Sequence, residues 1–253
     1  MTLSLDLPQA PASPLGRLDP RWKLAALLGA AILIAPVQTP LPALIAWAGA
    51  LLLAVLGRLP ARWFTSRLIA GLALPAFFAL WLPFTIREGQ AVHEVVGITV
   101  SAAGTQRAVA LVAKAGCIIT LVLIVLATAP LQDTFKAAHA LRMPGWLVHL
   151  VLMTYRYAHL LGDEFGRLRV ALRVRGYRNR AGLHSYRTIG HVAGTLLVRG
   201  HERSERVAEA MRCRAFDGRF RSLHTFRARA ADGLFLAAVL GLAASLLAWD
   251  LLS

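Results

Sequence analysis

Hydrophobic residues gather in five long runs separated by shorter polar stretches. The runs are Trp22–Val37, Leu41–Gly57, Leu68–Ile86, Ala108–Leu131 and Gly233–Trp249. A transmembrane helix needs about 20 predominantly apolar residues. The first two runs are slightly short, so they either span with little tilt or thin the bilayer locally. The pattern therefore predicts an all-α integral membrane protein with about five transmembrane helices.

Proline and β-branched residues subdivide this hydrophobic part. Only "PVQTP" (Pro36–Pro40) separates the first two runs, which predicts a hairpin of two helices. Pro75 and Pro83 lie inside the third run and are expected to bend it. The segment Val92–Gly104 between the third and fourth runs is rich in β-branched residues. We therefore expect a short external β-hairpin there.

Between the fourth and fifth runs the pattern changes to amphipathic helices. The expected helices are Phe135–Arg142, Leu147–Arg175 and Ile189–Arg214. In the second, apolar positions recur every three or four residues, which is the period of a helix with one apolar face. The members of this stripe, Thr154 included, are Leu150, Thr154, Tyr157, Leu161, Phe165, Leu168 and Leu172. Gly176 is a suitable helix stop, whereas Ala215 takes the equivalent place after the third helix, with Asp217–Gly218 as a second opportunity for a turn.

The distribution of charge predicts how the chain is oriented across the membrane. The chain has 28 Lys and Arg against 13 Asp and Glu, a net charge of +15. Residues 132–232 hold 19 of these basic residues and eight of the acids, and therefore +11 of the charge. Basic residues favour the cytoplasmic side of a membrane, so Arg17, Arg21 and Lys23 place the N-terminus in the cytoplasm. The predicted order is a cytoplasmic segment (1–21), four transmembrane helices (22–131), a basic cytoplasmic domain of long amphipathic helices (132–232) and a fifth transmembrane helix (233–253).

The sequence offers no chemistry for catalysis. It has no phosphate-binding P-loop, no GxSxG and no HExxH motif. Asp163 and Glu164 are adjacent, so they face different sides of a helix and are expected to pair with Arg167 one turn on. His149 and His159 also fall on different helix faces, and the histidines lack metal-ligand spacing. We therefore expect no catalytic residues, no metal ligands and no cofactor.

Two features of the hydrophobic runs have competing explanations. Lys114 lies in the fourth run, and a charged residue within a membrane is costly and often functional. Because it is near the expected external end of the run, the favoured explanation is that its side chain snorkels to the membrane surface. Ala237, Gly241 and Ser245 form a stripe of small residues on the fifth run, which permits close helix packing. That packing is expected within the chain by default, and against another subunit otherwise.

A short repeat links the two long amphipathic helices. The segments "ALRVRGY" and "AMRCRAF" each place an arginine, Arg175 or Arg214, at the last turn of its helix, followed by an aromatic residue, Tyr177 or Phe216. A cation is stabilised at the negative end of the helix dipole, and this alone would explain a basic residue. Arginine also binds carboxylates through two parallel hydrogen bonds from its planar guanidinium group. Arg and Tyr are frequent anchor residues at protein interfaces. Anionic lipid remains the competing partner of a basic face, but the repetition favours two docking points on matching partners.

The repeat resembles the paired signatures of the T component of energy-coupling factor (ECF) transporters. Three further stretches are similar to the cobalt/nickel branch of that family, the CbiQ type: "RLDPRWKL", "TYRYAHLLGDE" and "VRGHERSERVAEAMRCRAFDG". The resemblance covers nearly the whole chain. It implies a multi-pass protein of the cell inner (cytoplasmic) membrane that transmits ATP-driven movement, while another subunit holds the cobalt or nickel ion.

The resemblance also implies partners and docking residues. The implied partners are two ATP-binding-cassette ATPase subunits, a membrane substrate-capture subunit and the lipid bilayer, with no nucleic acid expected. By position, the ATPase-docking residues would be Val174, Arg175, Gly176, Cys213, Arg214 and Ala215, with Tyr177 and Phe216 as adjoining aromatics. The family pattern has Ala at positions 174 and 213 and Gly at 215. The change at 215 leaves open how the second helix ends.

Two alternatives remain from the sequence alone. The chain could be the T component of a vitamin transporter, or one shared by several capture subunits. It could instead be a membrane-anchored basic adaptor that binds nucleic acid or anionic lipid. An adaptor would lose binding gradually as arginines are removed, whereas docking would depend on two of them.

Overall fold

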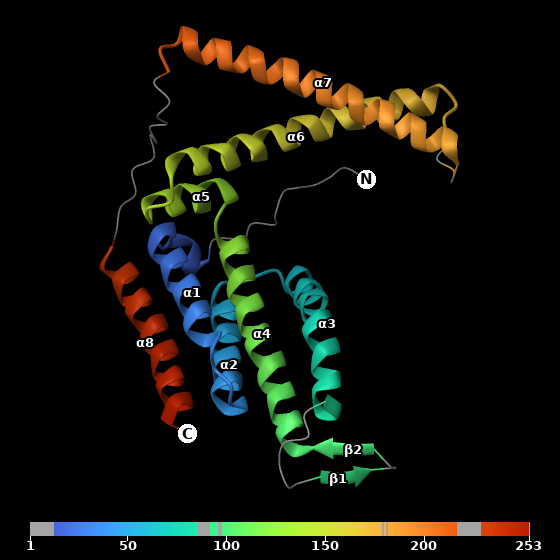
Figure 1. Cartoon of the computed structure of the whole chain (residues 1–253). Helices are drawn as coiled ribbons and strands as arrows, with labels where there is room; N and C mark the ends of the chain where they lie inside the picture. The colour runs from blue at the N-terminus through green and yellow to red at the C-terminus, as the bar shows by residue number, and fades with distance from the viewer. Residues whose placement is uncertain are drawn as a thin grey trace. The chain divides into compact units, whose positions relative to one another are not determined.

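Each of the five hydrophobic runs forms a helix in the computed structural model (Figure 1). The structure describes residues 13–85, 92–95, 98–178, 180, 182–216 and 229–252. Its elements are a 3-10 turn Pro14–Arg17, α1 (Pro20–Ile34), α2 (Pro40–Leu56), α3 (Ala61–Thr85), β1 (Val92–Val95), β2 (Ile98–Ser101), α4 (Ala102–Thr128), α5 (Leu131–Ala140), α6 (Gly145–Val174), α7 (Leu183–Cys213) and α8 (Ala230–Leu252). The prediction of an α-helical integral membrane protein is confirmed.

The described chain divides into two units. One, which we call the apolar unit, contains α1 to α5, the strands and α8, and the other, the basic unit, contains α6 and α7. Three helices of the apolar unit are long and apolar enough to cross a membrane, over Ala61–Pro83, Ala103–Thr128 and Ala230–Leu252. The first two helices, at 15 and 17 residues, are as short as their sequences predict.

Several boundaries differ from the sequence predictions. Helix α3 begins at Ala61 rather than Leu68, and α4 begins at Ala102 rather than Ala108. Helix α4 ends at Thr128, and Leu131 begins α5 rather than ending a span. Helix α7 begins at Leu183, six residues before the predicted start at Ile189. The basic stretch before Ile189 suggested a linker, but residues 183–188 contain no Gly or Pro to stop a helix. The expected hairpin is present, with β1 and β2 paired antiparallel.

Helix α4 is the centre of the apolar unit. It packs against α1, α2 and α3, while α8 packs against α1 and α2. The α2 face in this core is a row of small residues, Ala43, Ala46, Ala50 and Ala54, each at most 5% exposed. Small side chains let helix backbones approach closely, which is the main packing device where lipid rather than water surrounds a helix bundle.

Helices α2 and α4 approach each other closely at a glycine. A Cβ atom on Gly116 of α4 would lie 2.6 Å from the indole ring of Trp47 on α2. Glycine therefore occupies this position because no larger residue fits beside the ring. The indole is a rigid group that cannot rotate one end out of the way, so the site has little capacity to adapt.

A buried aspartate of α8 holds one end of the apolar unit together. Asp232 is 1% exposed and accepts hydrogen bonds from the backbone amides of Asp19, at 3.0 Å, and of Arg229, at 2.7 Å. Beside it, the buried Lys23 ammonium group donates to the backbone carbonyl of Thr128 at 3.2 Å, at the last residue of α4. These groups satisfy helix-end amides and carbonyls that have no partner within their own helices.

A second aspartate of α8 holds the opposite end. Asp250 accepts hydrogen bonds from the amides of Gln38, at 3.0 Å, and of Thr39, at 2.8 Å, and from the Thr39 hydroxyl. Thr39 is the residue before α2, and its hydroxyl donates to Asp250 rather than capping the helix. Lys114, predicted to snorkel, reaches the same α1–α2 connection and donates to the carbonyl of Val37 at 3.4 Å.

The small-residue stripe of α8 does not pack within the described unit. Ala237, Gly241 and Ser245 are exposed, and a Cβ on Gly241 would meet nothing within 4 Å. The buried residues of α8 are instead Asp232, Ala243 and Leu246. The default expectation of packing within the chain is therefore wrong. A small-residue pattern marks a face on which close packing is allowed, but it does not identify the partner.

The Gly116 contact gives a prediction about stability. The Gly116→Ala variant should lower the free energy of unfolding by about 1–3 kcal/mol, because the added methyl group overlaps the Trp47 ring. Thermal unfolding of the detergent-solubilised protein measures the effect. Gly241→Ala is the matched control, since its Cβ enters open space and alanine favours a helix, so it should not lower the melting temperature. Equal melting temperatures for the Gly116→Ala variant and wild type would contradict the assigned contact.

Candidate functional site: two helix ends that carry arginine

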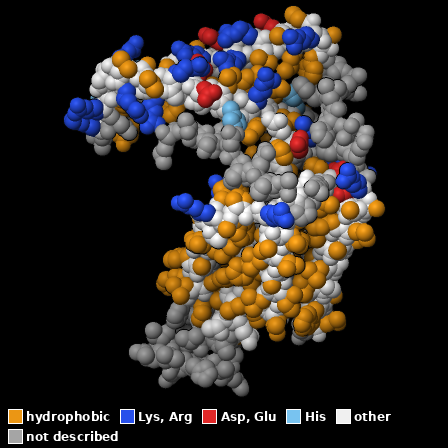
Figure 2. All heavy atoms as spheres, turned by 180° about the vertical axis from the view of Figure 1, so that it is seen from behind, with side chains coloured by type: hydrophobic (Ala, Val, Ile, Leu, Met, Phe, Trp, Pro, Cys, Tyr) orange, Lys and Arg blue, Asp and Glu red, His pale blue; other side chains and the backbone are white. Residues whose placement is uncertain are grey.

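The two long helices of the basic unit carry the sequence repeat. Helix α6 has 30 residues and α7 has 31, and the two cross each other beside their connection (Figure 1). Lys and Arg side chains gather over these helices, whereas hydrophobic side chains dominate the surface of the apolar unit (Figure 2). Large apolar side chains are exposed on the apolar unit, as expected for a surface in contact with lipid.

Helix α6 ends in a Schellman turn. Gly176 has a φ of +78°, in the left-handed region that glycine adopts without strain. Its amide donates to the carbonyl of Arg173 at 3.0 Å, and the amide of Tyr177 donates to the carbonyl of Leu172, also at 3.0 Å. These two bonds satisfy carbonyls at the helix end that would otherwise lack a partner. Arg175 is the last residue before the left-handed position.

Helix α7 ends in the same turn without a glycine. Ala215 has a φ of +55° and its amide donates to the carbonyl of Arg212 at 3.0 Å. The amide of Phe216 donates to the carbonyl of Met211 at 3.1 Å. Arg214 therefore holds the same position in its turn as Arg175 does in the first. The second helix thus ends as the first does, and the alternative turn at Asp217–Gly218 lies outside the described residues.

The two arginines of the repeat are therefore equivalent in backbone structure as well as in sequence, because each occupies the same position in a Schellman turn. Arg175 and Arg214 are both exposed, as are their neighbours Val174 and Cys213. Within the part of the chain that the structure describes, neither guanidinium group has an ion pair. Each lies at the negative end of a helix dipole, which favours a cation but leaves its hydrogen-bond donors available.

The two aromatic residues of the repeat have different surroundings. Phe216 is 37% exposed, whereas Tyr177 lines a groove between α6 and α7. The hydroxyl oxygen of Tyr177 is buried and has no hydrogen-bond partner among the described residues. Leu172 lines the same groove, which fits the hydrophobic contact that accompanies a Schellman turn. Phe216 is therefore the more exposed of the two residues.

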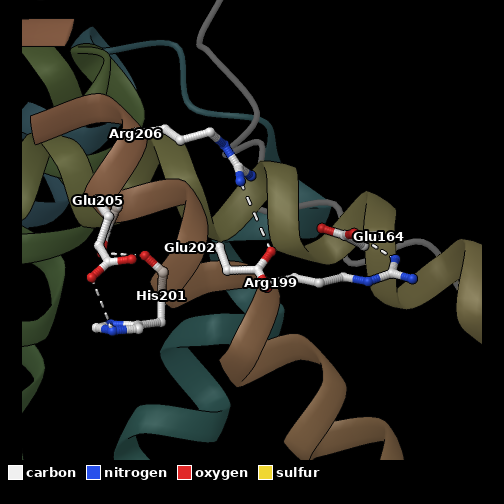
Figure 3. A network of polar contacts seen from close by, with 7 residues as sticks. Glu164, Arg199, His201, Glu202, Glu205 and Arg206 are labelled. Carbon is white, nitrogen blue, oxygen red and sulfur yellow. Dashed lines mark hydrogen bonds and ion pairs between the residues drawn. The ribbon is translucent and has the colours of Figure 1, made fainter. Parts of the chain in front are cut away.

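An ion pair joins the two helices where they cross. Glu164 of α6 is 9% exposed, and its Oε1 accepts a hydrogen bond from Arg199 Nη1 of α7 at 2.8 Å (Figure 3). This hydrogen bond holds the pKa of Glu164 below its ordinary value, and the nearby charges of Arg203 and Arg167 act in the same direction. The sequence predicted Arg167 as the partner because of helical spacing. The hydrogen-bonded partner is Arg199, which only the crossing of the two helices reveals.

The described residues contain no group of three or more His, Cys, Asp or Glu side chains that could hold a metal ion. The Nδ1 atom of His159 lies 2.9 Å from the carbonyl oxygen of Tyr155. Cys117 and Cys213 are both free thiols, the first buried and the second exposed.

Known proteins are similar to this chain in sequence. The family described as cobalt transport protein, CbiQ, matches residues 11–225. The cobalt transport protein CbiQ of Rhodobacter capsulatus is 30% identical over 153 residues, which are 60% of this chain and 61% of that protein. An uncharacterized protein of Methanocaldococcus jannaschii is 30% identical over 99 residues, or 39% of this chain and 36% of that protein. The chain thus matches less than two thirds of the length of either relative.

The alanine at the left-handed position gives a prediction. Ala215→Gly should stabilise the end of α7 by about 1 kcal/mol, because glycine has no Cβ to strain at positive φ. Gly176→Ala should weaken the end of α6 by a similar amount. Hydrogen exchange of the Phe216 and Tyr177 amides measures both effects, each as a roughly fivefold change in protection. Slower exchange after Gly176→Ala would contradict the left-handed assignment.

The crossing ion pair gives a prediction about pH. Folding lowers the pKa of Glu164, so the ionised carboxylate stabilises the folded state. This stabilisation is complete above the ordinary pKa of 4.5 and is lost as the pH falls below that value. Spin labels at positions 156 and 206 report the distance between α6 and α7. In the wild type the distribution of distances between the labels should broaden in acid. In the Glu164→Gln variant this distribution should be broad at every pH. A wild-type distribution that stays narrow down to about pH 3 would contradict the assigned pairing.

Proposed function

The chain belongs to the CbiQ cobalt transport protein family, and we propose that it is the transmembrane coupling (T) subunit of an ECF-type importer for cobalt or nickel ions. It is a membrane transport component. In the proposed complex it does not bind ATP itself, but passes the movement of two ATP-binding-cassette subunits to a separate capture subunit, which holds the ion.

The observation that carries this proposal is the duplicated helix end. Arg175 and Arg214 occupy equivalent positions in two Schellman turns, both exposed. A single basic surface would require no such equivalence, whereas two matching partner sites would. Arginine is suited to docking on a partner subunit because its guanidinium group can bind a carboxylate through two parallel hydrogen bonds. We assign Val174, Gly176, Cys213 and Ala215 to the same docking surfaces, and Phe216 as an adjoining aromatic contact.

The arrangement of the helices also suits two separate partners. Helix α7 starts close to the end of α6 and then extends for 31 residues, so its own end lies up to about 45 Å from its start. The C-terminal ends of α6 and α7 therefore lie toward different ends of the basic unit (Figure 1), and each of these helix ends carries one of the two arginines. A pair of subunits can reach both positions, one on each. We propose that closure of the ATPase pair moves the two ends relative to each other.

The crossing point provides the physical link for such movement. Two rigid helices that are tied at one point transmit a displacement at their ends as a rotation about that point. Glu164 and Arg199 form that tie. In the apolar unit, the exposed stripe of Ala237, Gly241 and Ser245 offers a face for close packing by the capture subunit.

Two other assignments stay open to test. A T component for a vitamin would have the same docking ends, and the capture subunit that co-purifies would distinguish it. A basic adaptor would bind nucleic acid or anionic lipid through many arginines at once. The free and equivalent positions of Arg175 and Arg214 favour two discrete contacts over such a distributed surface.

The test is recovery of ATPase subunits from native membranes. Full-length wild type, isolated in mild detergent, should bring down ATP-binding-cassette subunits. The Arg175→Glu/Arg214→Glu variant should lose at least about nine tenths of them, because each carboxylate repels the acidic partner group that arginine binds. Bound proteins are identified by mass spectrometry.

The matched control is Arg156→Glu/Arg206→Glu, which makes the same change in charge on α6 and α7 away from their ends. It should retain the ATPase subunits. Equal losses in both double variants would indicate a distributed basic surface and refute discrete docking. Absence of ATPase subunits from the wild-type sample would refute the T-subunit proposal itself.

A further inference from the structure

The crossing of α6 and α7 leaves an apolar groove at the surface. The groove has a volume of about 550 Å³, within the range of ligand-binding pockets. Phe165 and Leu172 of α6 and Ile189, Val192 and Leu196 of α7 supply most of its lining. Phe165 and Ile189 are 40% and 53% exposed, so the groove walls are open to the surroundings rather than closed by their own side chains.

Cations border this apolar surface. Arg169 and Arg173 of α6 are part of the groove lining. Among the described residues neither of them has an ion pair. The whole stretch from Phe165 to Leu196 contains seven Arg and no Asp or Glu. An apolar groove with this border is complementary to a ligand that has both a hydrocarbon part and a negative charge.

We propose that the groove binds one anionic phospholipid, with an acyl chain along the aliphatic lining and the phosphate at Arg169 and Arg173. Anionic lipids are the amphiphiles that basic segments meet at the cytoplasmic face of a membrane. The site is distinct from docking at Arg175 and Arg214, so either proposal can fail without the other. A bound lipid would tether the crossing helices to the membrane surface on which they move.

The test uses the full-length chain in non-ionic detergent and native mass spectrometry. Phosphatidylglycerol and phosphatidylcholine with identical acyl chains are added separately. Wild type should retain one phosphatidylglycerol, and about tenfold less phosphatidylcholine, because only the first has a net negative charge for the arginines. Arg169→Gln/Arg173→Gln should reduce phosphatidylglycerol retention by about tenfold, whereas Arg156→Gln/Arg206→Gln, with the same loss of charge elsewhere, should not.

A second pair of variants tests the apolar part. Ile189→Glu places a carboxylate in the groove and should abolish retention, whereas Leu197→Glu, which is 74% exposed and outside the lining, should retain the lipid. Both positions are exposed, so folding should survive, and helix content measured by circular dichroism checks this. Equal losses in these two variants would show attraction to net charge alone and overturn the proposal.

Competitors separate the remaining explanations. Inorganic phosphate at millimolar concentration should not displace the lipid, because it lacks the acyl chain. Displacement by phosphate would overturn the amphiphile assignment. Recovery of ATPase subunits is measured on the same variants and should be unchanged in Arg169→Gln/Arg173→Gln. Loss of those subunits would instead assign the groove to protein docking, while leaving the T-subunit proposal intact.

Discussion

The structure depends on one constraint, which is that backbone groups at helix ends need hydrogen-bond partners where water is scarce. In the apolar unit, Asp232 and Asp250 of α8 bind the amides before α1 and α2, and Lys23 binds the last carbonyl of α4. Each of these side chains joins segments that are far apart in the sequence. Polar contacts therefore hold both ends of α1 and the start of α2, in addition to the alanine-rich core.

The basic unit meets the same constraint with backbone alone, and this has a functional consequence. Two Schellman turns satisfy the carbonyls at the ends of α6 and α7. Because no side chain is used for this purpose, Arg175 and Arg214 remain available to partners. The rest of the unit is suited to transmitting movement, with two long helices tied at Glu164 and Arg199. In the account proposed above, movement of the ATPases enters at the two arginines and passes through this crossing.

The sequence predicted features that follow from local periodicity or composition. It indicated the five apolar helices and the hairpin, and it placed the end of α6 to within a few residues, because their hydrophobic patterns are strong. The starts of α3 and α4 lie six or seven residues before the predicted positions, since the polar residues there did not mark the helix. It missed features that depend on packing between distant segments. Neither the Glu164–Arg199 pair nor the outward-facing stripe of Gly241 could be read from spacing along one helix. The turn at Ala215 was also uncertain, since alanine seldom adopts a positive φ and only the resemblance of "AMRCRAF" to the first repeat pointed to it.

The central claim is that the end of α7 contacts an ATPase subunit, and Cys213 allows a direct measurement. This thiol is exposed next to Arg214, whereas Cys117 is buried, so a maleimide photocrosslinker should label Cys213 selectively in native membranes. Illumination should join the chain to an ATP-binding-cassette subunit, and Arg214→Glu should abolish that product. A crosslink found only to lipid, or an ATPase crosslink that survives Arg214→Glu unchanged, would contradict the account.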